Sequence, residues 1–220
     1  MRELGDGIWQ LEATGRFTGV YLVAADELVL VDTGTPGRAT RLAEELEGTD
    51  TRPGLIVLTH GDLDHTGGAN ELRRRLGIEV WAPAADRALL EHRLRGRGML
   101  PTLARVLSRA RPPQVDHWFE PSDTIAGLQV IATPGHTPGH VSLRRGGLLI
   151  AGDAVRTGER FRMPPRFMNV DNEQAARSVI ALADLDGLDL AVSGHGAPAH
   201  DATAKLRQLA AQLHPAQPSH

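Results

Sequence analysis

Two histidines and two aspartates stand within six positions of the stretch "LTHGDLDHTGG", residues 58–68. They are His60, Asp62, Asp64 and His65. Imidazole nitrogens and carboxylate oxygens bind divalent metal ions, and they also act as general acids and bases. The chain contains no cysteine, so any metal would be held by nitrogen and oxygen alone. The stretch therefore raises the hypothesis of a metal site.

Three later segments carry further residues of the same chemical types. His136 and His140 lie in "TPGHTPGH", Asp153 lies in "IAGD", and His195 lies in "VSGHG". Taken alone, each has a structural interpretation as a hydrogen-bonded turn residue or a loop cap. Their joint occurrence in glycine-bearing segments favours a metal centre assembled from distant parts of the chain.

Each of these polar clusters comes at or just after the end of a predicted strand. "VYLVAADELVLVDTG" predicts two strands, residues 20–24 and 28–32, around a short polar break. The continuous apolar run over residues 54–59 indicates a strand buried on both faces, and it leads directly into His60. Strand ends are rigid supports on which catalytic groups converge. Further strands are predicted within residues 123–133, 140–153 and 188–194.

Helical patterns separate these strands. They cover residues 36–48, 67–77, 172–185 and 200–213, with Asp171 or Asn172 as the cap of the third. Residues 84–111 predict a helical insertion of two helices that interrupts the strand–helix order and could form a lid over a site. No linker composition divides the chain, which predicts a single domain over residues 1–215 and a flexible tail over residues 216–220.

The order of these motifs resembles that of the metallo-β-lactamase-fold hydrolases. The resemblance runs from "VYLVAADELVLVDTGTPG" through "LTHGDLDHTGG", "TPGHTPGHVSL" and "IAGDAV" to "VSGHG". It implies an α/β fold, a four-layer αββα sandwich of two mixed β-sheets flanked by helices, with a two-metal site along one edge. It also implies roles for individual residues: His60, Asp62 and His136 as ligands of the first metal, Asp64, His65 and His195 as ligands of the second, Asp153 as the bridge, and Asp32 as a support behind the ligands. His140 belongs to a motif but receives no ligand role.

One position departs from the family pattern. The usual motif is His-x-His-x-Asp-His, and Asp62 replaces the middle histidine. Asp62 could still bind the metal, since its carboxylate oxygen reaches about as far as a histidine Nδ1. It could instead turn away and leave the first site weak, or it could select a harder metal. With three aspartates and a hydroxide, a centre of two divalent ions would be formally neutral. The resemblance implies two divalent ions as cofactors, with Zn²⁺ the leading candidate, and the third carboxylate, Asp62, lets Fe²⁺ or Mn²⁺ compete better with Zn²⁺.

The leading functional hypothesis is a metal-dependent hydrolase in which a metal-bound hydroxide attacks the substrate at the two-metal site. Asp64 and Asp153 are its candidate catalytic carboxylates, with Asp64 moving the proton. The expected substrate is a small ester, lactone or thioester. Candidate substrate contacts follow Asp153, although packing against the middle helices explains them as well: Arg160, Arg162, Arg166 and Phe167. An iron-dependent oxidoreductase of the same fold and a metal-binding module without hydrolase activity are the alternatives.

Composition narrows the range of partners. The formal net charge is -3, which provides no basic surface for nucleic acid and disfavours a nuclease. No apolar run approaches 18 residues, and the acidic, glycine-bearing start of the chain does not read as a signal peptide. A cytoplasmic protein acting on a small molecule is expected, with neither a membrane nor nucleic acid as partner. The helices of residues 84–111 could also pair two chains in a homodimer.

Overall fold

The computed structural model describes residues 1–5, 7–15, 18–49, 51–93 and 111–213. The early strands of these ranges form one mixed sheet of seven strands in chain order. The first four strands pair antiparallel and the last four pair parallel. Their bounds are β1 (Arg2–Gly5), β2 (Ile8–Gln10), β3 (Tyr21–Ala24), β4 (Leu28–Val31), β5 (Leu55–Val57), β6 (Glu79–Pro83) and β7 (His117–Phe119).

The later strands form a second sheet of six strands, in the order β13-β12-β11-β10-β9-β8. Here β11 and β12 pair parallel and the other neighbours pair antiparallel, so this sheet is mixed as well. Both sheets therefore agree with the sequence-based expectation. The bounds are β8 (Thr124–Ile125), β9 (Leu128–Ala132), β10 (Val141–Arg145), β11 (Leu148–Ile150), β12 (Leu190–Val192) and β13 (Ala199–His200).

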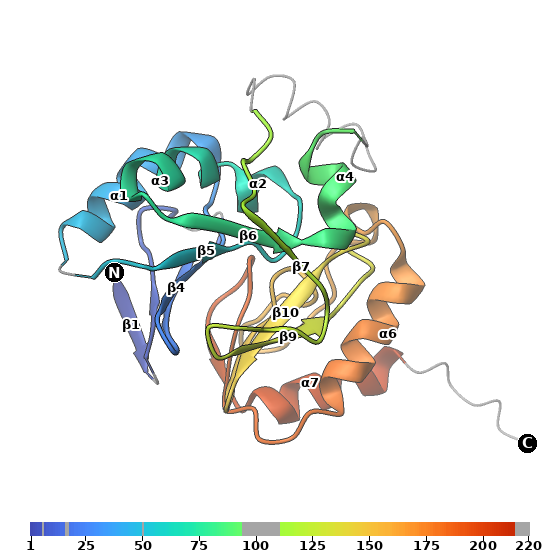
Figure 1. Ribbon diagram of the computed structural model, residues 1–220. Helices are drawn as coiled ribbons and strands as arrows, with labels where there is room; N and C mark the ends of the chain where they lie inside the picture. The colour runs from blue at the N-terminus through green and yellow to red at the C-terminus, as the bar shows by residue number, and fades with distance from the viewer. Residues whose placement is uncertain (6, 16–17, 50, 94–110, 214–220) are drawn as a thin grey trace, which may run out of the picture.

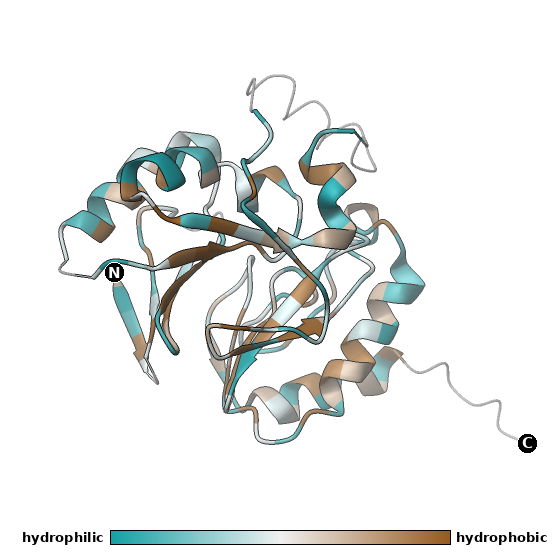
Figure 2. Cartoon of the chain, in the orientation of Figure 1, coloured by the Kyte–Doolittle hydropathy of each residue, from teal (hydrophilic) through white to brown (hydrophobic). Residues whose placement is uncertain are grey.

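Side-chain alternation along the strands explains why the two sheets stack with helices outside them. In β4, Val29 and Val31 pack in the core between the sheets, whereas Leu30 packs with the buried side of helices α1 (Ala39–Glu47) and α3 (Ala69–Leu76). Helices α6 (Asn172–Ala183) and α7 (Ala202–Leu213) cover the other sheet. Figure 1 shows the two helical layers outside the two sheets, and Figure 2 shows apolar strands between them. The predicted four-layer αββα sandwich is confirmed.

The helix ends follow local sequence signals. The Asp171 side chain accepts hydrogen bonds from the backbone N–H groups of Glu173 and Gln174, which makes it the cap of α6. Helix α3 ends where Gly77 takes a left-handed conformation. Of the predicted insertion at residues 84–111, the structure shows the short helices η2 (Ala84–Asp86) and α4 (Arg87–Leu90). Residues 94–110 and the predicted tail, residues 216–220, lie outside the described residues. In those that are described, no helix is long and apolar enough to cross a membrane.

Candidate metal centre

The predicted metal-binding residues lie on loops that follow strand ends in both sheets. His60 comes three residues after β5, and helix α2 (Leu63–Thr66) then carries Asp64 and His65. The second sheet contributes its residues after β9, β11 and β12: His136, Asp153 and His195. Strands β9, β11 and β12 run in the same direction, so their carboxyl ends meet at one edge of that sheet. The structure brings all seven predicted residues together at the seam between the sheets.

The first group consists of His60, Asp62 and His136, whose nearest ligand atoms lie within 4.8 Å of one another. Asp62 Oδ2 lies 3.1 Å from His136 Nε2 and 3.9 Å from His60 Nε2. The Asp62 carboxylate therefore points into the group, and the interpretation in which it turns away does not describe this structure.

The second group consists of Asp64, His65 and His195. Asp64 Oδ2 lies 3.1 Å from His195 Nε2 and 3.9 Å from His65 Nε2. Asp153 contacts members of both groups: its Oδ2 lies 3.3 Å from His195 Nε2 and 3.6 Å from His136 Nε2, and its Oδ1 lies 3.4 Å from His65 Nε2. Asp153 thus occupies the position between the groups that a bridging carboxylate requires.

The spacing and burial of these atoms suit divalent ions. Ligands at the bond lengths usual for zinc stand about 3.4 Å apart around a tetrahedral ion, and the observed separations scatter about this value. Within the described chain, the buried atoms His60 Nε2, His65 Nε2, His195 Nε2 and Asp153 Oδ1 have no hydrogen-bond partner. Buried polar atoms are normally satisfied. Four such atoms within one cluster therefore fit a site that holds cations.

A glycine makes this convergence possible. A Cβ atom at position 194 would lie 2.2 Å from Asp153 Oδ1 and 2.4 Å from His65 Cε1. Gly194 is therefore required by the close approach of the loop before His195 to the other ligands.

Groups behind the ligands fix the orientation of the imidazole rings. Asp32 Oδ2 lies 2.7 Å from His65 Nδ1, and Asp32 also accepts the backbone N–H of Thr59 at 2.8 Å. Asn169 Oδ1 lies 3.2 Å from His136 Nδ1. In both histidines the Nδ1 atom is occupied and Nε2 faces the site, as in many metal-binding histidines. Sequence reasoning found Asp32 but not Asn169, which stands in "RFMNVD" without a recognisable motif.

His140 acts on Asp153 rather than on the centre itself. The backbone N–H of Asp153 donates to His140 Nε2 at 2.8 Å, and His140 Nδ1 lies 2.8 Å from Thr133 Oγ1. Since Nε2 accepts a hydrogen bond, Nδ1 carries the proton and donates to Thr133. Burial lowers the pKa of His140 to about 3, so the ring stays neutral. His140 therefore holds the backbone at Asp153 in place through a hydrogen bond.

Asp86 joins the two ligand-bearing loops. It is buried, and it accepts the backbone N–H of Gly61 at 2.8 Å, the Thr137 hydroxyl at 2.7 Å and the backbone N–H of Gly139 at 2.6 Å. Gly61 follows His60, and the other two donors lie in the loop that follows His136. A single carboxylate therefore sets the separation of loops from two different sheets. Its sequence context, the start of a predicted helix, gave no signal of this role.

Burial and the neighbouring charged groups shift the pKa values of the clustered residues. Burial, reinforced by His65, lowers the pKa of His60 well below its ordinary value. Burial also opposes the charge on His195, but the carboxylates of Asp153 and Asp64 outweigh it and raise the pKa of His195 to about 10. The pKa of Asp153 is held well below its usual range against burial by His65 and His195. Without a metal, protons thus balance the carboxylates, and binding of a divalent ion would displace them.

The predicted substrate contacts separate into two sets. Arg160 and Arg162 line a cavity of about 710 Å³ together with His195. Arg166 and Phe167 lie on the short helix η3 (Arg166–Met168) and are exposed, with Phe167 at 75% of its full accessibility. Pro165 is the part of this segment that reaches the cavity.

Comparison with known proteins agrees with this geometry. The profile of the Metallo-beta-lactamase superfamily matches residues 13–195. The chain belongs to the metallo-β-lactamase superfamily. It is 30% identical to the probable metallo-hydrolase YflN of Bacillus subtilis over 77% of this chain and 75% of that protein. It is also 30% identical to the hydroxyacylglutathione hydrolase GloC of Haemophilus influenzae, over 76% and 79% of the two chains.

A solved structure of the superfamily shows the same architecture. The metallo-beta-lactamase family protein TTHA1429 of Thermus thermophilus superposes with a TM-score of 0.73 and 25% identity, over 96% of this chain and 80% of that one. The expected enzyme class, a metallo-hydrolase of the metallo-β-lactamase superfamily, is therefore confirmed.

Proposed function

We propose that the protein hydrolyses a small thioester, or a related ester or lactone, at a two-metal site. The observation that carries this proposal is the group of seven converging residues, four of whose buried ligand atoms lack partners in the described chain. His60, Asp62 and His136 would hold one ion, Asp64, His65 and His195 the other, and Asp153 would bridge them. Bound divalent ions act as Lewis acids and lower the pKa of bound water, which supplies hydroxide near neutral pH.

Substrate would approach from one side of the cluster. The side chains of Asp64, Asp62 and His195 are 37%, 24% and 23% exposed, whereas those of His60, His65, His136 and Asp153 are at most 5% exposed. Thr18 donates a hydrogen bond to Asp64 Oδ2 at 3.3 Å and so steadies that carboxylate. Asp64 is therefore placed to move a proton at the open side, and Asp153 to hold the ligands at the closed side.

The choice of a thioester rests on relatedness together with the chemistry of the site. The hydroxyacylglutathione hydrolase of Haemophilus influenzae aligns over most of both chains. A hydroxide nucleophile requires neither serine nor cysteine, which suits a chain without cysteine. The protein would thus act on a small molecule, and a cytoplasmic location agrees with the lack of cysteine.

The test combines metal analysis with a substrate panel. Protein purified with added zinc, manganese or iron would be analysed for metal content and assayed on a thioester, an ester, a lactone and a phosphodiester. We expect two ions per chain and hydrolysis of the thioester. Asp153→Asn should lower kcat at least about a hundredfold with an unchanged far-UV spectrum. His200→Gln, at an exposed site on β13, is the matched control. Full turnover by Asp153→Asn would refute the proposal.

The ligand composition of the site supports a second candidate function. Asp62 gives the centre a third carboxylate, and oxygen-rich ligand sets favour iron and manganese over zinc. An iron-dependent oxidoreductase is the function that this composition would serve. Iron at two ions per chain, with oxygen uptake and no hydrolysis, would favour that function. A protein that binds metal but performs neither reaction would be a metal-binding module.

A further inference from the structure

The cavity beside His195 is lined by positive charge. Its volume is about 710 Å³, and three arginines line it: Arg156, Arg160 and Arg162. Glu159 is the one carboxylate among the lining residues that the structure describes. Because His195 belongs to the candidate metal centre, any group in this cavity would lie next to the reaction site.

These arginines form no ion pair with Glu159 or with any other carboxylate of the described chain. No hydrogen bond or ion pair joins the guanidinium groups of Arg156, Arg160 or Arg162 to another described residue. Some arginines elsewhere do pair with carboxylates: Arg73 with Asp116 at 2.5 Å, and Arg75 with Glu47 at 2.6 Å. What distinguishes this cavity is that three arginines, unpaired among the described residues, line the same space.

The backbone places two of these like charges side by side. The Arg156 N–H donates to the Arg162 carbonyl at 2.8 Å, and the Arg162 N–H donates to the Arg156 carbonyl at 3.1 Å. This is an antiparallel hydrogen-bonded pair, in which opposite side chains project from the same face about 5 Å apart at Cβ. Like charges in such a pair destabilise it. An anion bound between the two guanidinium groups would offset this repulsion.

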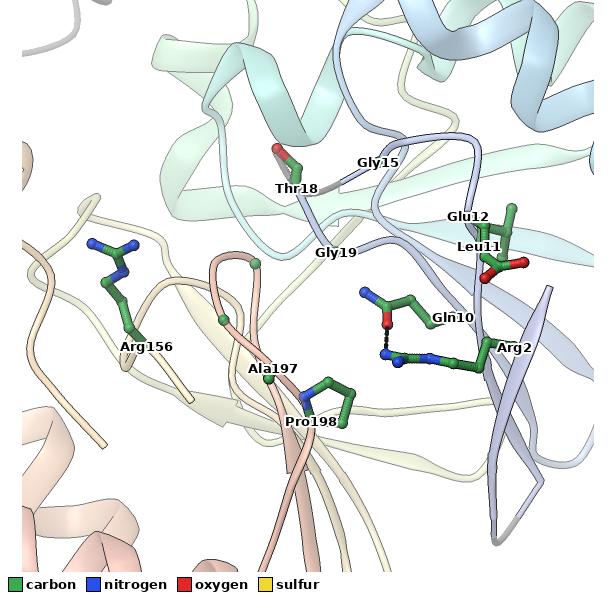
Figure 3. A pocket seen from close by; sticks show the side chains of 12 residues that line it. Arg2, Gln10, Leu11, Glu12, Gly15, Thr18, Gly19, Arg156, Ala197 and Pro198 are labelled. Carbon is green, nitrogen blue, oxygen red and sulfur yellow. Dashed lines mark hydrogen bonds between the residues drawn. The ribbon is translucent and has the colours of Figure 1, made fainter. Parts of the chain in front are cut away.

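The hairpin that carries the pair is fixed to the metal centre. Thr157 N–H donates to Ser193 Oγ at 3.1 Å, and the two hydroxyl oxygens lie 2.8 Å apart. Ser193 stands two residues before His195. Phe161 is buried in the core under the second sheet, so its neighbours Arg160 and Arg162 face away from that core. Arg156 also lines a neighbouring cavity, opposite Arg2 and Gln10 and across the loop of Ala197 and Pro198 (Figure 3).

We propose that Arg156 and Arg162, with Arg160 beside them, bind an anionic group of the substrate, a carboxylate or a phosphate, next to the hydrolysed bond. This inference rests on the proposed hydrolase function and narrows its substrate to anionic thioesters or esters. Arginine suits the task because its planar guanidinium matches both anions with paired donors. The arginines position the substrate, while the reaction itself stays with the metal-centre residues.

The kinetic test compares three S-acetyl thioesters that differ in one group: 3-mercaptopropionate, 2-mercaptoethyl phosphate and the neutral 3-mercaptopropionamide. We expect one of the anionic thioesters to exceed the neutral one at least about tenfold in kcat/KM. In Arg156→Gln/Arg162→Gln, KM for that thioester should rise about twentyfold while kcat and the neutral substrate change less than about twofold. Arg41→Gln, an exposed arginine on α1, removes a charge without touching the cavity. Equal kcat/KM for all three thioesters would overturn the inference and leave the hydrolase function intact.

A binding test shows whether the arginines bind an anion even if none of these thioesters is hydrolysed. Succinate and inorganic phosphate are titrated calorimetrically into the metal-loaded protein, the double variant and Arg41→Gln. We expect one probe to bind the wild type and Arg41→Gln equally, and to bind the double variant at least about tenfold more weakly. The probe that responds identifies the carboxylate or the phosphate. An unchanged affinity in the double variant, or no binding of either probe, overturns the inference.

Discussion

Replacement of Asp86 by asparagine tests whether one buried carboxylate sets the spacing of the two ligand loops. Two donors, Gly61 N–H and the Thr137 hydroxyl, point at Oδ2, and Gly139 N–H points at Oδ1. An amide has one acceptor oxygen, so the best orientation of asparagine keeps the first two bonds. Its NH2 group would then face Gly139 N–H across a contact that measures 2.6 Å in the native protein, which sets two buried donors against each other.

The magnitude follows from that single lost bond. A hydrogen bond to a charged group, with the donor left buried, contributes about 2–3 kcal/mol. Burial raises the pKa of Asp86 because it disfavours the charged carboxylate, and the three hydrogen-bond donors partly offset this cost. At about 2–4 °C per kcal/mol for a chain of this size, the melting temperature should fall by about 4–12 °C. The loops should also separate, which weakens metal binding at His60 and His136.

The assay measures thermal unfolding and zinc affinity for Asp86→Asn and for a matched control, Asp116→Asn. Asp116 also accepts three hydrogen bonds, two from Arg73 and one from the backbone of Val80, but it is partly exposed and its hydrogen bonds join neither loop. The control should lose less than about 1 kcal/mol and keep its zinc affinity. The smallest usual contribution of a hydrogen bond is about 0.5 kcal/mol. If the free energy of unfolding of Asp86→Asn differs from the wild-type value by less than this, and zinc binds equally well, Asp86 does not set the spacing of the loops.

Three further predictions concern the metal centre. Asp32→Asn should weaken metal binding about 10- to 100-fold, because the amide no longer orients His65 as a carboxylate does; competition with a zinc chelator measures it. Asp62→His should shift the bound metal from manganese or iron towards zinc, since the centre loses one negative charge; elemental analysis after growth in mixed metals checks this. In the metal-free protein, the raised pKa of His195 contributes stability that is fully present below its ordinary value of 6.5 and is lost as pH rises towards about 10. Thermal shift of the metal-free protein should therefore show a melting temperature that falls as the pH rises between these two values, and a rise over that range would contradict the sign.

The residues that the structure brings together at the candidate metal centre could be predicted from sequence because their signal is local. His60, Asp62, Asp64 and His65 stand in one short motif, and each of the other three, His136, Asp153 and His195, closely follows an apolar strand pattern with glycine beside it. The period-two alternation of strands such as β4 similarly predicted which faces would be buried.

The supporting residues could not be predicted in the same way, because their partners are distant in the chain. Asp86 bonds to groups 25 and 53 residues away, and Asn169 orients a histidine 33 residues before it. Neither stands in a pattern that differs from an ordinary helix start or turn. The like-charged pair of Arg156 and Arg162 was equally hidden, since only the backbone pairing places the two side chains together.

The division of the chain between its two sheets has a consequence for assembly. The first sheet is complete by Phe119 and the second is built from Thr124 onwards, so each half can form its strands from contiguous sequence. His60 and His65 belong to the early half, whereas His136, Asp153 and His195 belong to the late half. Neither half holds a complete ligand set. Ions at the proposed two-metal site would therefore complete their coordination only after the two halves dock, and bound ions would slow the separation of the halves.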